Sequence, residues 1–190
     1  MLKLKKPALL LIDIQKGMAG KENEAYWGGN RNNPDAERKS QTILVRWRKW
    51  ALPIFHIRHS SQNPHSKLHA SHEGFAFNEL TAPIVGEPII TKNVNSAFIG
   101  TDLKERLDAL GIDTLVIVGL TTNHCVSTTT RMAGNFGYDT YLISDATATF
   151  DRKGIHGEMY TAETVHLTTL ASLRDEFATI LSTEQLLKEM

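Results

Sequence analysis

The chain has 190 residues, of which 41% are hydrophobic and 22% charged, and its formal net charge is zero. This composition is typical of a globular protein, so we expect one domain over residues 1–190. A balanced charge argues against nucleic acid or an acidic membrane surface as partners. The single cysteine excludes an internal disulfide and a CxxC pair for redox or zinc chemistry.

The N-terminus has a basic start followed by a short apolar run that ends at Asp13. This run is too short for a secretory signal or a membrane span, so we expect a buried strand in a cytoplasmic protein. A net charge near zero gives little repulsion between copies of the chain. We therefore expect a homo-oligomer, either a dimer or a tetramer.

Apolar, strand-like segments alternate with segments of helical pattern along the whole chain. The expected strands are residues 7–12, 52–58, 87–91, 113–119, 139–144 and 177–181. The expected helices are residues 34–50, 102–110, 124–136, 156–175 and 183–190. Apolar strands separated by helices indicate a parallel sheet covered on both faces. The predicted fold class is therefore α/β, a three-layer α/β/α doubly wound arrangement with a mainly parallel six-stranded sheet.

Two long segments, residues 17–33 and 59–86, have no clear pattern. Loops of this length inside a compact domain usually form lids or pocket walls. In an open parallel sheet, ligands bind beyond the carboxyl ends of the strands. The least regular parts of the chain are therefore expected to surround a ligand at that edge.

Three chemically active residues follow strands. Asp13 ends the first strand, Lys92 ends the third, and Cys125 follows the fourth at the start of a helix. If these strands are parallel neighbours, the three side chains meet at one edge of the sheet. Free N–H groups at a helix start favour a thiolate and could also hold an oxyanion. The alternatives are an inert buried cysteine, a turn-forming Asp13 and a solvated Lys92.

Three motifs together resemble the isochorismatase-like cysteine hydrolase superfamily. They are Asp-x-Gln after the first strand, Lys-x-x-x-Ser-Ala-Phe after the third and Gly-x-x-Thr-x-x-Cys-Val after the fourth. The resemblance implies a six-stranded parallel sheet and a catalytic triad of Asp13, Lys92 and Cys125. It also implies a cis peptide bond between Leu120 and Thr121, and an oxyanion hole made by the amides of Thr121 and Cys125.

The resemblance further implies a reaction. Members similar to nicotinamidases, N-carbamoylsarcosine amidohydrolases and streptothricin hydrolases cleave a C–N bond through a thioester on the cysteine. Isochorismatases proper cleave a vinyl ether and lack the cysteine. Because Cys125 is present, we expect hydrolysis of an amide, carbamoyl or lactam group of a small molecule, without a cofactor. Vinyl ether hydrolysis is the alternative.

Four further residues are candidates for the substrate pocket: Gln15, Trp27, Asn95 and Phe150. Nicotinamidases bind a metal through an Asp and several His after the second strand. Here Ile54 replaces that Asp, and His56 and His59 have a poor spacing for one metal. We therefore expect no metal, and we expect these histidines to line the pocket or lie at a subunit contact.

Two other classes of protein fit parts of the sequence. Residues 124–131 match HCx5R, the signature of cysteine phosphatases, but the segment has no glycine to let it wrap a phosphate. A catalytically silent interaction protein is the other option. It would have little reason to keep a costly ion pair beside a thiol.

Overall fold

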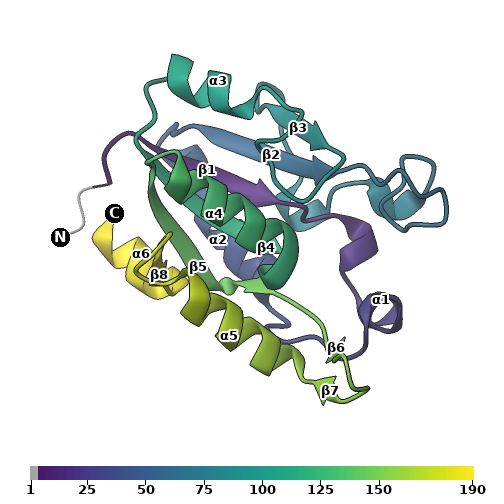
Figure 1. The fold of residues 1–190 in the computed structure, drawn as a ribbon. Coiled ribbons are helices and arrows are strands. Elements are labelled where there is room, and N and C mark those ends of the chain that lie inside the picture. The colour runs from purple at the N-terminus through teal and green to yellow at the C-terminus, as the bar shows by residue number, and fades with distance from the viewer. Residues whose placement is uncertain (1–3) are drawn as a thin grey trace.

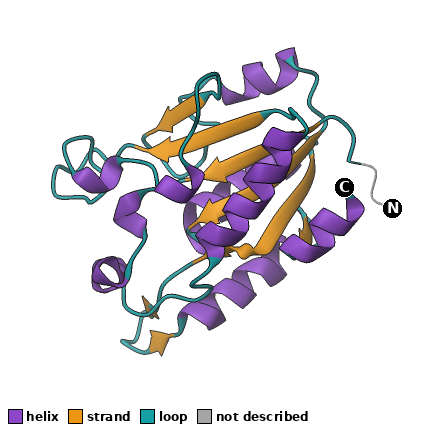
Figure 2. Ribbon diagram, turned by 180° about the vertical axis from the view of Figure 1, so that it is seen from behind, coloured by secondary structure: helices purple, strands orange, loops and turns teal. Residues whose placement is uncertain are grey.

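The computed structural model describes residues 4–190, so the first three residues of the basic start lie outside the described part. Its main feature is a six-stranded sheet in the order β3-β2-β1-β4-β5-β8, in which every neighbouring pair is parallel. The strands are β1 (Pro7–Ile12), β2 (Ile54–His59), β3 (Ile89–Lys92), β4 (Thr114–Leu120), β5 (Asp139–Ala148) and β8 (Thr179–Leu181). Their arrows point the same way in Figure 2.

Helices cover both faces of this sheet (Figure 1). They are α2 (Ala36–Lys49), α3 (Leu103–Ala109), α4 (Ser127–Asn135), α5 (Ala162–Leu173) and α6 (Thr183–Glu189), whereas α1 (Lys21–Trp27) lies apart from the sheet. A π-helical turn, Thr122–Val126, precedes α4, and short 3-10 turns lie at Lys16–Met18, Glu73–Phe75 and Glu79–Thr81. A small antiparallel hairpin, β6 (Arg152–Lys153) and β7 (Met159–Tyr160), lies apart from the sheet.

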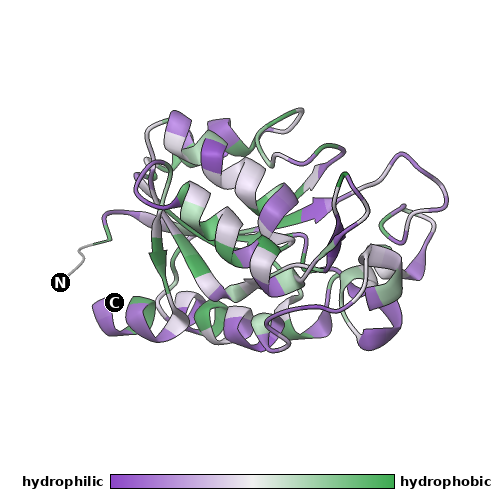
Figure 3. Cartoon of the chain, turned by 60° about the horizontal axis from the view of Figure 1, so that its bottom comes forward, coloured by the Kyte–Doolittle hydropathy of each residue, from purple (hydrophilic) through white to green (hydrophobic). Residues whose placement is uncertain are grey.

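Alternation along β1 explains the two covering layers. Leu10 belongs to a core cluster with residues of α3, α4 and α5, whereas Leu9 and Leu11 belong to a second cluster with residues of α2 and α6. Successive side chains of a strand point to opposite faces, so an uninterrupted apolar strand serves both layers. Full burial of one such side chain is worth about 1.5–3 kcal/mol. Hydrophobic colouring follows the central strands in Figure 3.

The predicted fold class is confirmed, with four local corrections. First, β3 is an edge strand separated from β1 by β2, so the first and third strands are not neighbours. Second, residues 156–161 precede α5, and β7 occupies part of this stretch. Third, β5 continues to Ala148 because its last residues pair again with β4 after an irregularity. Fourth, residues 17–33 contain the helix α1.

Gly119 allows β4 to approach β1 closely where the site begins. Its φ is 126°, and a Cβ atom there would lie 2.0 Å from the Ile12 carbonyl oxygen. Any other residue would force the two strands apart just before Asp13. Among the described helices, none combines the length and the apolar character needed to span a membrane.

Candidate active site

The three residues expected at the sheet edge do lie together, although their strands are not all adjacent. Asp13 follows β1 with a φ of 50°, in the left-handed region that few residues other than glycine adopt. Lys92 is the last residue of β3, and Cys125 lies in the π-helical turn after β4. The Lys92 side chain extends across the end of β2 to reach Asp13.

Asp13 and Lys92 form a fully buried ion pair. The Lys92 Nζ atom donates to Asp13 Oδ2 at 2.7 Å, and both side chains have 0% exposure. The other carboxylate oxygen, Oδ1, is buried without a hydrogen-bond partner. A carboxylate oxygen, a His59 ring nitrogen and the Cys125 sulfur all lie within 4.8 Å of one another. One oxygen of Asp13 is thus held by a cation while the other is free to accept a proton.

His59 is a site residue whose role the sequence prediction missed. It is the last residue of β2, and its Nδ1 atom lies 3.2 Å from Lys92 Nζ. Burial and the Lys92 charge lower the pKa of His59, although Asp13 opposes this effect. A neutral ring can accept a hydrogen bond from the ammonium through Nδ1. The sequence analysis expected His59 to line the pocket or lie at a subunit contact, and it does line the cavity. The strand-end rule, applied to the second strand, would also have placed it beside Asp13 and Lys92.

The thiol differs from the expectation of a lowered pKa. Burial raises the pKa of Cys125 well above its usual range, the Asp13 charge adds to this effect, and Lys92 opposes it. Desolvation and the neighbouring negative charge therefore raise the pKa of the thiol more than the N–H groups of the helix start lower it. The resting state holds a protonated thiol beside a carboxylate, and the sulfur needs Asp13 to remove its proton.

A cavity of about 200 Å³ opens onto the sulfur. It is lined by Met18, Trp27, His59, Ser61, Ser66, Leu68, Asn95, Thr121, His124, Cys125 and Arg152. Pockets for drug-sized ligands usually hold about 300–1,000 Å³. This volume therefore suits a small molecule, with one aromatic wall and several polar groups to orient it.

Two of the four predicted pocket residues line this cavity. Asn95 does so, and its Oδ1 atom lies 3.8 Å from the Cys125 sulfur. Trp27 does so as well, held by a hydrogen bond from Nε1 to the Gly17 carbonyl oxygen at 2.7 Å. The peptide bond between Leu120 and Thr121 is cis, and both Thr121 and Cys125 line the cavity.

The other two predicted pocket residues support the cavity from behind. Gln15 is fully buried, and its side chain donates to the carbonyl oxygens of His59 and Phe75 and accepts from the His59 amide. It fixes the end of β2 and does not line the cavity. Phe150 is also fully buried and stacks on Trp27, with ring centroids 6.3 Å apart. It holds the aromatic wall in place.

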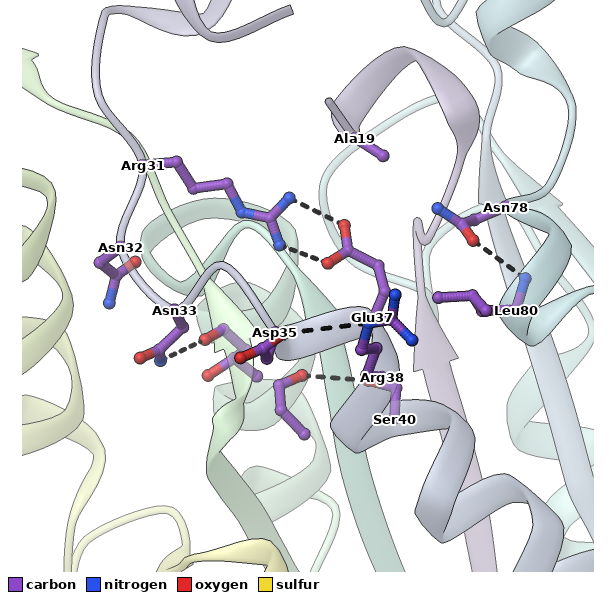
Figure 4. Close-up of polar contacts among 12 residues, drawn as sticks. Ala19, Arg31, Asn32, Asn33, Asp35, Glu37, Arg38, Ser40, Asn78 and Leu80 are labelled. Carbon is purple, nitrogen blue, oxygen red and sulfur yellow. Dashed lines mark hydrogen bonds and ion pairs between the residues drawn. The ribbon is translucent and has the colours of Figure 1, made fainter. Parts of the chain in front are cut away.

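The segment between α1 and α2 is anchored by a buried ion pair. Two dashed lines in Figure 4 join the Arg31 guanidinium to the Glu37 carboxylate, and the two bonds measure 2.8 and 2.7 Å. Both side chains are less than 9% exposed. Because this segment follows Trp27, the pair fixes the chain that carries the aromatic wall.

A buried histidine on α5 supports the turn that carries the cysteine. The Nδ1 atom of His166 lies 2.9 Å from the Thr122 hydroxyl oxygen, and Nε2 lies 3.5 Å from Asn33 Nδ2. Asn33 in turn donates to the carbonyl oxygens of Ser144 and Thr147. The sequence prediction missed this contact because His166 lies on a helical segment with no other sign of function.

The histidines of β2 fit the prediction in part. His59 lines the cavity, but His56 is buried outside its lining, with Nε2 2.7 Å from a Glu87 carboxylate oxygen. A metal among Asp13, His59 and Cys125 would lie against the Lys92 ammonium, which already contacts Asp13 and His59. The donor set therefore does not fit a divalent cation.

The phosphatase alternative is contradicted by the backbone and by Arg131. A phosphate-binding loop needs several N–H groups facing one anion. Here residues 122–135 form a π-helical turn and a helix, so most of these N–H groups bond within the helix. The Arg131 guanidinium lies 4.8 Å from the Phe177 ring centroid and bonds to Ser127.

A buried carboxylate, an ammonium and a thiol lie at the carboxyl edge of a doubly wound parallel sheet, an arrangement typical of a hydrolase with a three-layer α/β/α fold. Comparisons with known proteins narrow this class. The isochorismatase domain model matches residues 7–185, and the chain belongs to the isochorismatase family.

Three similar proteins illustrate the family. The uncharacterized isochorismatase family protein YrdC of Bacillus subtilis is 51% identical over 184 residues, covering 97% of this chain and 96% of that protein. Nicotinamidase 3 of Arabidopsis thaliana is 27% identical, covering 96% of this chain and 88% of that protein. A structure described as a hydrolase of the isochorismatase family from Chromobacterium violaceum has a TM-score of 0.90 and 39% identity. It covers 96% of this chain and 92% of that chain.

Proposed function

We propose that this isochorismatase-family hydrolase cleaves the C–N bond of a small amide through a thioester on Cys125. The observation that carries the proposal is the divided role of the Asp13 carboxylate. One oxygen is bonded to Lys92, the other is buried without a partner, and a carboxylate oxygen of Asp13 lies within 4.8 Å of the Cys125 sulfur. A buried, unpaired oxygen is costly, and a thiol proton is the missing partner. The relative named nicotinamidase supports an amide as the substrate.

The first half of the reaction forms the thioester. Asp13 takes the proton of Cys125 as the sulfur attacks the amide carbon, so a C–S bond forms and the carbonyl electrons move to oxygen. The backbone N–H groups of Thr121 and Cys125 stabilise this oxyanion. Protonated Asp13 then donates its proton to the nitrogen. The C–N bond breaks and ammonia or an amine leaves.

The second half returns the enzyme to its starting state. Water gives a proton to Asp13 while its oxygen attacks the thioester carbon. The C–S bond breaks, the acid product leaves, and the sulfur recovers the proton from Asp13. Lys92 keeps Asp13 oriented throughout, and His59 accepts a hydrogen bond from the same ammonium.

A screen of small primary amides for ammonia release tests the proposal. Turnover by the wild type, together with an acyl adduct on the lone cysteine in intact-mass spectra, is the expected result. Cys125→Ser changes little volume and should lose turnover and adduct while its thermal unfolding stays within a few degrees of the wild type. His69→Ala is the control, because that partly exposed side chain lies outside the cavity lining, bonds to nearby Ser71 and should leave turnover unchanged.

Other outcomes would point elsewhere. Turnover retained in Cys125→Ser would exclude the covalent route. Activity on a vinyl ether without activity on any amide would favour the isochorismatase reaction. A chain that is inactive toward both classes and gives no adduct would support an interaction protein.

A further inference from the structure

Arg152 is a cation of the cavity that has no acidic partner. It lies at the start of β6 and lines the cavity together with Cys125. Its Nη2 atom lies 3.4 Å from His124 Nδ1, and its Nε atom is buried without a hydrogen-bond partner. Within residues 4–190, no carboxylate forms an ion pair with this guanidinium. A partly buried guanidinium without an anion is costly.

Four other arginines of the chain have an acidic or an aromatic partner. Arg31 and Arg48 form short ion pairs with Glu37 and Glu87. Arg58 and Arg131 lie over aromatic rings, at 4.2 and 4.8 Å from the ring centroids. None of these four lines the cavity that contains the sulfur. The Nε atoms of Arg31 and Arg58 are also buried without a hydrogen-bond partner. What distinguishes Arg152 is that it lines the cavity containing the sulfur and has no ion pair within the described residues.

The acids close to Arg152 along the chain are engaged elsewhere. Asp151 accepts hydrogen bonds from the amide and side chain of Asn30 and from the Ala162 amide. Glu158 accepts from the Tyr160 hydroxyl and the His156 amide. The Asp151 contacts also tie the base of the hairpin to the α1–α2 loop and to α5. The backbone that carries Arg152 is thus anchored before any ligand binds.

The other titratable groups of the site do not neutralise the positive charge of Arg152. Asp13 is paired with Lys92, so this pair adds no net charge. Burial and the Arg152 charge lower the pKa of His124, and burial and Lys92 lower that of His59. Both rings are therefore held neutral. The cavity that contains the nucleophile therefore carries one unbalanced positive charge.

We propose that Arg152 binds a carboxylate on the substrate, so that the enzyme selects small amides that also carry an acid group. This inference rests on the proposed amide hydrolysis and adds a substrate class to it. Guanidinium donors are arranged to bind a carboxylate with two parallel hydrogen bonds. The two terminal nitrogens of Arg152 can supply such a pair. A carboxylate would also remove the cost of the unpaired cation, and a neutral amide of equal size would not.

Alkylation of the lone cysteine tests this inference without requiring turnover. Iodoacetate and iodoacetamide differ only by a carboxylate against an amide, and both add one group to the sulfur with loss of iodide. The measured quantity is the ratio of their rate constants at Cys125, followed by intact mass at fixed pH. We expect this ratio to fall about tenfold or more in Arg152→Gln, as is typical when a charge-assisted hydrogen bond is lost. Arg152→Lys should lie between the two.

Arg131→Gln is the matched control, because that side chain is also an arginine near the cysteine turn but lies outside the cavity. Its ratio should equal that of the wild type. Added salt should reduce the ratio in the wild type, because screening weakens the attraction of the anion. This salt series needs no variant, so it decides the question even if Arg152→Gln does not fold. A ratio that is the same in Arg152→Gln as in the wild type, or insensitive to salt, would overturn the inference.

A turnover assay gives a second test of the inference, independent of the alkylation rates. Succinamate and succinamide share one skeleton, with a carboxylate in the first where the second has another amide. We expect higher kcat/KM for succinamate in the wild type, and a selective loss on succinamate in Arg152→Gln. No turnover of any amide with a normal alkylation pattern would overturn the proposed function and leave the anion site standing. Turnover that favours succinamide, or equal losses on both amides in Arg152→Gln, would overturn the anion site and leave the amidase standing.

Discussion

Removing Lys92 alone should destabilise the protein strongly. Lys92→Met replaces the ammonium by an uncharged side chain of similar length. It leaves the Asp13 carboxylate at 0% exposure with neither oxygen bonded to a cation. Stranding one charge of a buried pair costs about 3–5 kcal/mol. Most domains have a free energy of unfolding of about 5–15 kcal/mol, so the variant should lose a large part of its stability.

Urea unfolding at pH 7, followed by tryptophan fluorescence, measures this loss. Trp47 is fully buried and reports the transition. Lys16→Met is the matched control: its ion pair with Glu79 is of similar length, at 2.9 against 2.7 Å, but the side chains are 47% and 85% exposed. Such a surface pair contributes about 0–1 kcal/mol. We therefore expect the same substitution to cost far less at Lys16.

The double variant Asp13→Asn/Lys92→Met separates a stranded charge from a lost contact. Because it leaves neither charge buried, it should be more stable than Lys92→Met alone. The deficit of Lys92→Met should also shrink on acidification, since a proton on nearby His59 supplies a positive charge beside Asp13. The reasoning is refuted if Lys92→Met costs no more than Lys16→Met, or if the double variant is the least stable of the three.

Three further predictions concern the strand contact, the thiol and an ion pair away from the site. Gly119→Ala should destabilise by at least about 2 kcal/mol more than Gly100→Ala in urea unfolding. Both glycines have positive φ, but a Cβ meets backbone at 2.0 Å only at Gly119 and open space at Gly100. Equal losses would show that the clash is relieved at no cost. Asp13→Asn should abolish turnover yet lower the pKa of Cys125, because the Asp13 charge raises that pKa and Lys92 lowers it. The midpoint of the pH profile for iodoacetamide alkylation measures this, and an upward or unchanged midpoint would contradict it. Burial tends to raise the pKa of Glu87, but bonds from Arg48, the Ile84 amide and His56 outweigh it and lower the pKa from 4.5 to about 2. Glu87 therefore stabilises the fold fully above pH 4.5, and this contribution is lost as the pH falls toward 2. The free energy of unfolding should drop less across this interval in Glu87→Gln than in the wild type, and equal drops would contradict the assignment.

Local sequence pattern was enough to predict most of the helices and strands, and to place Asp13, Lys92 and Cys125 at strand ends. A continuous apolar run such as residues 7–12 can be buried only in a sheet covered on both faces, and Asp13 directly after it marks the strand end. The same reasoning located Lys92. It did not locate β6 and β7, because a two-residue strand has no periodicity to detect. It also placed Gln15 and Phe150 in the pocket, since adjacency in sequence does not tell which side of a wall a side chain faces.

The state of the thiol could not be predicted from the sequence either. Its position after a strand suggested a lowered pKa, but the outcome depends on how deeply the sulfur is buried and how close Asp13 lies. Both depend on how segments far apart in the chain pack together, and Asp13 and Cys125 are themselves more than a hundred residues apart. Electrostatic and desolvation effects are set by such distances and not by neighbours in sequence.

The order of residues by itself determined a parallel α/β architecture and which side chains stand at strand ends, because burial pattern and strand length are local properties. The lateral order of the strands was decided only by tertiary packing. That order puts His59 between Asp13 and Lys92 and makes the lysine reach across β2. Packing also decided that Arg152, on a hairpin without sequence signal, faces the cavity with no acidic partner. Charge balance in a cavity is a sum over groups brought together from the whole chain, so it exists only once the chain has folded.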